Sequence, residues 1–263
     1  MDDGSADAFS RGALGRFDLH VHTTMSDGDV PLEEVVAIAT ARGVTVGIAD
    51  HVSSRNSRLF VSDATRLAAY LAALEPYPVY RSAELCWCDA FSASLGPEVL
   101  SRFDYLVGSN HGFVLPDGQE ISPWSRQLPV PWADDPHRVM DTIVDQLCRI
   151  VETMPIAIVG HPTLLPPGVL KLGADVEEWW TEEREDRLIA ATIRGGVAIE
   201  ISNRYRLPHD RFLSRARAAG ARFSLGSDGH QRDQVARLDW SIDTALRVGI
   251  SDDDLFVPGR RLR

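Results

Sequence analysis

The chain has 263 residues, of which 44% are hydrophobic and 25% are charged, and this composition excludes a disordered or fibrous protein. The formal net charge of −11 argues against a broad surface for nucleic acid or anionic lipid, because a negative surface repels phosphate-rich polymers. No apolar run reaches membrane-spanning length, and the acidic start of the chain lacks the basic and apolar segments of an export signal.

The first part of the chain alternates apolar runs with segments of helical spacing. A strand is predicted near residues 16–22, followed by a helix that Pro31 opens and by a second strand over 44–50. A helix around 63–74 and a third strand over 78–85 continue the pattern. Each strand is therefore expected to be followed by a helix.

The same alternation continues towards the end of the chain. A fourth strand is predicted over 103–110, then a long loop rich in Pro and Trp, a helix near 137–152 and a fifth strand over 155–160. Helical segments precede a sixth strand over 196–202 and a seventh over 221–227. A loop of this length predicts a lid or a wall of a substrate pocket.

Short apolar strands that alternate with helices predict parallel pairing within an α/β protein. Right-handed crossovers then allow an open doubly wound sheet or a closed barrel. No glycine-rich phosphate loop follows the first strand, which disfavours the nucleotide-binding form of the open sheet. We expect a frayed tail over 1–15 and one domain over 16–263, because no repeat or linker divides the chain.

The cysteines indicate a reducing compartment. Cys86, Cys88 and Cys148 are odd in number and lack paired metal-site spacing. We therefore expect a cytoplasmic protein. The negative net charge and the lack of a membrane-spanning run add the expectation that it has no membrane partner and does not bind nucleic acid.

Polar residues gather at the carboxyl ends of the predicted strands. In a parallel α/β barrel these ends meet on one face, where side chains from different strands can surround a common site. His137 and His209 instead lie at predicted helix starts and are expected at the surface. The residues at strand ends are His20, His22, His51, Glu84, His111, His161, Asp228 and His230.

The spacing of these residues suits a metal site. Residues i and i+2 of a strand share a face, so His20 and His22 can reach one ion, and Asp228 with His230 repeats that geometry. Mixed imidazole and carboxylate ligands favour zinc, manganese or iron. Asp27, in "SDGD", is either a further ligand or an ordinary turn residue.

Together, "DLHVHTTMSDG", "IADH", "AEL", "GSNH", "GHP" and "GSDGH" resemble the polymerase and histidinol phosphatase (PHP) family. The resemblance runs in order from Asp18 to His230. It implies a distorted (β/α)7 TIM-like barrel and a centre of two or three divalent ions, which would be Zn, Mn or Fe. The ligands that it implies are His20, His22, Asp27, His51, Glu84, His111, His161, Asp228 and His230.

The resemblance also implies how the ions divide these ligands. Glu84 would bridge two ions, and Asp228 would complete the site of His20 and His22. The second ion would be held by His51, His230 and Asp27, and the third by His111 and His161. Three divalent ions against three carboxylates leave a local charge of about +3, which attracts a phosphate despite the acidic surface.

This chemistry predicts an enzyme, a phosphatase that hydrolyses a small phosphomonoester through in-line attack by a metal-bound hydroxide. Arg204, just past the sixth strand in "EISNRYR", is the preferred residue for binding the phosphate. The residues expected to take a direct part in the reaction are Glu84, Asp228, His230 and Arg204. Other cations in such loops are Arg55, Arg58, Lys171 and Arg206.

Histidinol phosphate, an intermediate of histidine biosynthesis, is the favoured substrate because of the long insertion after "GSNHGF", where similar enzymes build part of their pocket. Two alternatives stay open. One is an amidohydrolase-like enzyme that cleaves C–N bonds, for which Lys171 lies in an unsuitable Pro- and Gly-rich loop. The other is a metal-binding regulatory domain without turnover, against which a complete ligand set argues.

Overall fold

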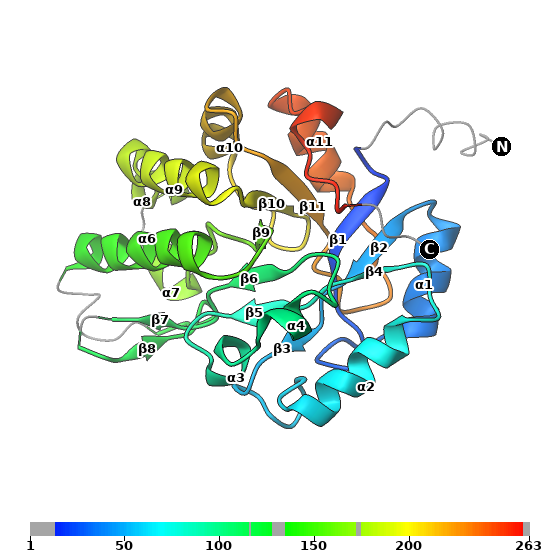
Figure 1. Cartoon of the computed structure of the whole chain (residues 1–263). Coiled ribbons are helices and arrows are strands. Elements are labelled where there is room, and N and C mark those ends of the chain that lie inside the picture. The colour runs from blue at the N-terminus through cyan, green and yellow to red at the C-terminus, as the bar shows by residue number, and fades with distance from the viewer. Residues whose placement is uncertain (1–13, 116, 128–134, 172–174, 260–263) are drawn as a thin grey trace.

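The structure is a computed structural model that describes residues 14–115, 117–127, 135–171 and 175–259. Figure 1 shows most of the strands in the middle of the molecule with helices around them. Of the predicted tail over 1–15, only Leu14 and Gly15 are among the described residues, and the extent of the domain stays a prediction.

The strands form two parallel sheets and one small antiparallel pair. The first sheet has the order β1 (Phe17–Val21), β2 (Thr45–Ile48), β4 (Tyr80–Arg81). The second has the order β11 (Phe223–Gly226), β10 (Ala198–Ser202), β9 (Ile158–Val159), β6 (Val107–Ser109), β5 (Glu84–Cys86), β3 (His51–Val52). The antiparallel pair is β7 (Phe113–Val114) with β8 (Glu120–Ile121), and it lies within the predicted long loop.

The chain passes from one parallel sheet to the other at two of the predicted strands. The predicted strand over 44–50 contains β2 and ends just before β3, which belongs to the other sheet, and the predicted strand over 78–85 contains β4 and the start of β5. Backbone hydrogen bonds continue across the break, because the amide of Ser82 donates to the carbonyl of Ile48 at 3.0 Å. Parallel strands alternating with helices confirm the predicted α/β class.

The helices lie close to the predicted positions. The longer ones are α1 (Leu32–Ala41), α2 (Ala64–Leu74), α6 (Pro136–Thr153), α9 (Glu182–Gly195), α10 (Asp210–Ala218) and α11 (Asp239–Arg247). The short ones are α3 (Ala90–Ala93), α4 (Pro97–Leu100), α7 (Pro167–Leu170), α8 (Val176–Trp179) and the 3-10 turn η1 (Asp252–Asp254). The side chain of Asp63 caps α2 by accepting hydrogen bonds from two backbone amides, which fixes its start.

Three groups of buried side chains form the core. One joins α6, α9 and α10 to β10 and β11, and it includes the fully buried Trp180 and Phe212. A second packs α1 and α2 against β2 and β5. The third lies among the strands and draws Leu19, Tyr80 and Ala198 from both parallel sheets. The strand ends that carry polar residues are therefore held by packing on both sides.

The described helices include none that is both long enough and apolar enough to cross a bilayer.

Replacing Gly47 by alanine tests the packing among the strands. An added Cβ would lie 1.7 Å from the hydroxyl oxygen of Tyr105, which donates a buried hydrogen bond to the carbonyl of Leu19 at 2.7 Å. We expect Gly47→Ala to lower the free energy of unfolding by about 1–3 kcal/mol in urea denaturation. Gly259→Ala, whose Cβ would meet nothing within 4 Å, should change it by less than about 0.5 kcal/mol. Equal stability of the two variants would contradict this packing.

Candidate metal centre

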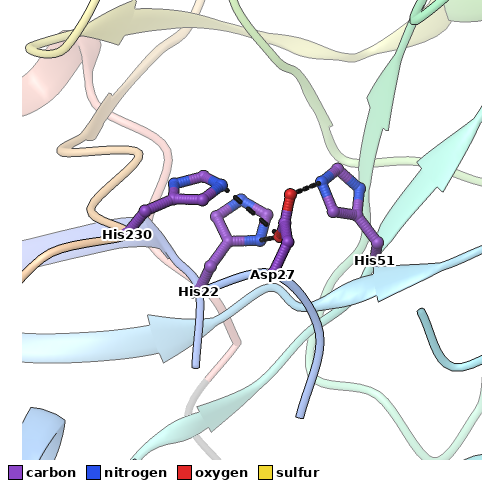
Figure 2. Close-up of side chains that lie close together, drawn as sticks. All are labelled: His22, Asp27, His51 and His230. Carbon is purple, nitrogen blue, oxygen red and sulfur yellow. Dashed lines mark ion pairs between the residues drawn. The ribbon is translucent and has the colours of Figure 1, made fainter. Parts of the chain in front are cut away.

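The predicted ligand residues come together in one cluster. They leave β1, the loop after it, β3, β5 and the segments after β6, β9 and β11. Figure 2 shows four of them side by side, with the carboxylate of Asp27 between the rings of His22, His51 and His230. The residues brought together are His20, His22, Asp27, His51, Glu84, His111, His161, Asp228 and His230.

Glu84 lies at the centre of the cluster and is only 1% exposed. Its Oε1 atom is 3.2 Å from Nε2 of His111 and 3.3 Å from Nε2 of His161. Its Oε2 atom is 2.9 Å from Nδ1 of His51. The two oxygens therefore face different groups of imidazoles, as a carboxylate that bridges two ions must do.

His20 and His22 direct their rings from β1 to one point. Their Nε2 atoms are 3.1 Å apart, and each lies 3.7 Å from Oε2 of Glu84. Oδ1 of Asp228 lies 3.3 Å from Nε2 of His22. These positions agree with the i, i+2 geometry expected of a strand.

Asp27 joins the centre although it lies in a loop. Its Oδ2 atom is 3.4 Å from Nε2 of His51, and its Oδ1 atom is 3.4 Å from Nε2 of His230. Oδ1 also lies 3.6 Å from Nδ1 of His22, so His22 belongs to this group as well as to that of His20. A turn residue without a further role would not face three imidazoles.

The chemistry of this cluster fits metal ions, and the buried His/Glu groups could hold them. Among the described residues, Nδ1 of His22 is buried without a hydrogen-bond partner, which a bound cation would supply. Four groups have ligand atoms within 4.8 Å of one another: His20, His22 and Glu84; His22, Asp27, His51 and His230; Glu84, His111 and His161; His51, Cys86 and His111.

Opposite charges hold the carboxylates of the centre ionised. Burial would raise the pKa of Glu84, but the charges of His111, His51 and His20 outweigh burial and hold it well below its usual range. Burial, together with the charge of His230, lowers the pKa of His22 to about 3. His22 is therefore neutral at pH 7, the form in which an imidazole binds a metal.

Glu200 on β10 supports the cluster, and the sequence analysis did not single it out. It is fully buried, and its Oε1 atom lies 2.7 Å from Nδ1 of His20. The backbone amide of His161 donates to its Oε2 atom at 2.6 Å. A carboxylate on Nδ1 turns Nε2 towards the metal position and raises the basicity of the ring. The available signal was an acid inside the apolar run "GVAIEIS", since such an acid needs a partner.

Two further buried acids, also missed, fix the loops that carry ligands. Oδ1 of Asp18 accepts a hydrogen bond from the amide of Ser227 at 2.8 Å, next to Asp228. Oδ1 and Oδ2 of Asp50 accept from the amide and the hydroxyl of Thr23 at 2.8 and 2.7 Å. Burial outweighs these bonds and raises the pKa of both acids to about 6.

A pocket of about 630 Å³ opens onto the cluster. Trp124, from the long loop after β6, stacks on His111 with ring centres 5.4 Å apart. Its Nε1 atom donates to the hydroxyl of Tyr205 at 3.2 Å, and both residues line the pocket. The long loop therefore supplies a wall of the pocket, as expected.

The candidate phosphate-binding cations differ in position. Arg204 lines the pocket, and a guanidinium nitrogen lies 3.6 Å from Oδ1 of Asp228. Arg55 also lines it, but pairs with Glu120. The described residues that line the pocket do not include Arg58, Lys171 or Arg206.

The two remaining histidines lie outside the cluster. His137 is exposed at the start of α6, as expected. The surface position expected for His209 is wrong, because its side chain is only 11% exposed and its Nε2 atom lies 2.8 Å from Oε1 of the buried Glu185. A helix start that packs on a neighbouring helix is buried whatever its local sequence.

Glu200→Gln tests the supporting carboxylate. The side-chain NH2 group of glutamine cannot accept a hydrogen bond. The variant therefore cannot accept hydrogen bonds both from Nδ1 of His20 and from the backbone amide of His161, as Glu200 does. We expect zinc to bind about 10- to 100-fold more weakly in a chelator-competition titration. Glu98→Gln, an exposed change on α4, is the matched control. Unchanged zinc affinity in Glu200→Gln would contradict the role of Glu200.

No family model matches the chain, and no curated protein matches it in sequence.

Proposed function

We propose that the protein is a metal-dependent phosphatase of the PHP type that hydrolyses a small phosphomonoester. The observation that carries the proposal is the central, buried Glu84, which faces imidazoles from separate strands beside an accessible pocket. A single structural ion would not require so many converging ligands or a pocket above them.

The same proposal includes a closed, distorted (β/α)7 barrel. The amide of Asp228 donates to the carbonyl of His20 at 2.8 Å, and that of His22 donates to the carbonyl of Gly229 at 3.0 Å. These bonds connect β1, at one end of the first parallel sheet, to the segment that follows β11, at one end of the second. The buried group with Leu19, Tyr80 and Ala198 supports closure, because the interior of a barrel is filled from all sides.

Hydrolysis of a phosphomonoester forms a bond between phosphorus and a water oxygen and breaks the bond to the leaving oxygen, which takes up a proton. Divalent ions, when bound, activate the water and neutralise the phosphoryl oxygens. The residues that would hold them are the nine clustered histidines and acids, among them Glu84, Asp228 and His230. Glu200 keeps His20 oriented throughout.

Arg204 is proposed to bind the phosphate. Its guanidinium lies beside Asp228 and contacts Nδ1 of His230, so it is held at the edge of the cluster and faces the pocket. Two of its N–H groups suit two phosphoryl oxygens.

The rest of the substrate is proposed to be small and partly apolar. A pocket of about 630 Å³ is of the size that encloses a small molecule. Phe60, Trp124 and Tyr205 line it and would exclude water from the reacting group. The net charge of −11 disfavours a polyanionic substrate. Histidinol phosphate, favoured by the resemblance to PHP enzymes, is the first substrate to test.

The main prediction is release of inorganic phosphate by the metal-loaded protein from a panel that includes histidinol phosphate. Chelation should abolish release, and added manganese or zinc should restore it. His20→Ala should lose both bound metal and turnover, whereas His137→Ala, at an exposed position, should keep both. Phosphate release that survives chelation or His20→Ala would contradict the proposal. Cleavage of an acyl amide with no phosphate release would favour the amidohydrolase alternative, and no turnover at all would favour a regulatory domain.

Arg204→Gln tests the phosphate-binding role. Loss of charge-assisted hydrogen bonds worth about 1.5–3 kcal/mol should lower kcat/KM roughly 10- to 100-fold, with metal content unchanged. Arg237→Gln removes an exposed arginine that pairs with Asp239 and should leave kcat/KM unchanged. An unaltered kcat/KM in Arg204→Gln would exclude this role.

A further inference from the structure

Cys86 lies inside the metal centre, although its spacing in the sequence indicates no metal site. It follows Glu84 by two residues on β5, so both side chains extend from the same face of the strand. Leu85, between them, packs on the opposite side in the core with α1 and α2. Cys86 is 2% exposed, and it lines the pocket.

The thiol is in contact with the imidazoles of the centre. Its Sγ atom lies 3.1 Å from Nδ1 of His111, whose Nε2 atom faces Glu84. The ligand atoms of Cys86, His51 and His111 all lie within 4.8 Å of one another. His51 is more than nine-tenths buried, and its Nδ1 atom lies 2.9 Å from Oε2 of Glu84. Three possible metal ligands thus converge beside the central carboxylate.

We propose that Cys86 is a metal ligand of this centre and coordinates an ion through its thiolate together with His51 and His111. The inference deepens the proposed function, since it concerns the same centre. A thiolate is a softer donor than a carboxylate, so this position should favour zinc over manganese or magnesium. Binding of the ion displaces the thiol proton, which passes to solvent.

His111 gives the position a particular property. Its two ring nitrogens face different neighbours, Nδ1 towards Cys86 and Nε2 towards Glu84 and His161. A neutral imidazole coordinates an ion through one nitrogen. His111 can therefore coordinate either an ion beside Cys86 or an ion between Glu84 and His161, but not both. A soft ion is expected to take the position beside Cys86.

The geometry also allows a role without coordination, in which the thiol only accepts a hydrogen bond from Nδ1 of His111. In that arrangement sulfur stays off the ion, and Cys86 orients the ring. Spectroscopy of the bound metal separates the two roles.

The first test uses a protein in which Cys88→Ser and Cys148→Ser leave Cys86 as the only cysteine. Cys88 is exposed and Cys148 lies on α6, and neither is among the described residues that line the pocket or form the clustered groups. Cobalt(II) bound to this protein should give an intense near-ultraviolet thiolate-to-metal absorption band. Adding Cys86→Ser should remove that band while the visible bands of bound cobalt remain. A cobalt-loaded protein without the ultraviolet band, or a band that persists in Cys86→Ser, would overturn the proposal.

A second measurement does not require a variant at Cys86. X-ray absorption of the zinc-loaded Cys88→Ser, Cys148→Ser protein should show a sulfur neighbour at about 2.3 Å beside nitrogen and oxygen at about 2.0–2.1 Å. A spectrum that shows nitrogen and oxygen neighbours but no sulfur would overturn the proposal.

The ratio of zinc to manganese affinity should also fall about tenfold or more in Cys86→Ser, and an unchanged ratio would count against the proposal. None of these readouts needs a substrate, so absence of phosphatase activity would leave them interpretable.

Discussion

The burial of the Glu84 carboxylate is the constraint on which the candidate metal centre depends. A charge that is 1% exposed is tolerated only where opposite charges or strong donors surround it. His51, His111 and His161 provide that surrounding, and each comes from a different strand segment. The strands must therefore keep their register for the charge to stay compensated, and this ties the site to the arrangement of the sheets.

A second set of buried acids holds the segments that carry the candidate ligands in place. Glu200 links the ring of His20 to the backbone of His161, so one carboxylate holds two ligand-bearing segments. Asp18 holds the backbone before Asp228. Because these acids bond mostly to backbone amides, they fix the course of the chain around the candidate ligands.

The molecule carries a negative net charge, but an arginine lines its pocket. The net charge of −11 repels large polyanions, while Arg204 places a positive charge at the pocket. Many surface acids are neutralised locally, as where Arg211 on α10 pairs with the exposed Glu177 on α8. A small anion that enters the pocket meets the guanidinium of Arg204.

The sequence by itself determined the α/β alternation, the helices over 63–74 and 137–152 and the polar residues that end the strands, because periodicity and strand ends are local properties. Only the tertiary structure decided that the chain changes sheets directly after 44–50 and within 78–85, because neighbouring strands set that register. Tertiary structure alone also revealed Glu200 beside His20, 180 residues away in sequence, and Cys86 beside His111, 25 residues away. Such contacts follow from the packing of distant strands, and no local pattern encodes them.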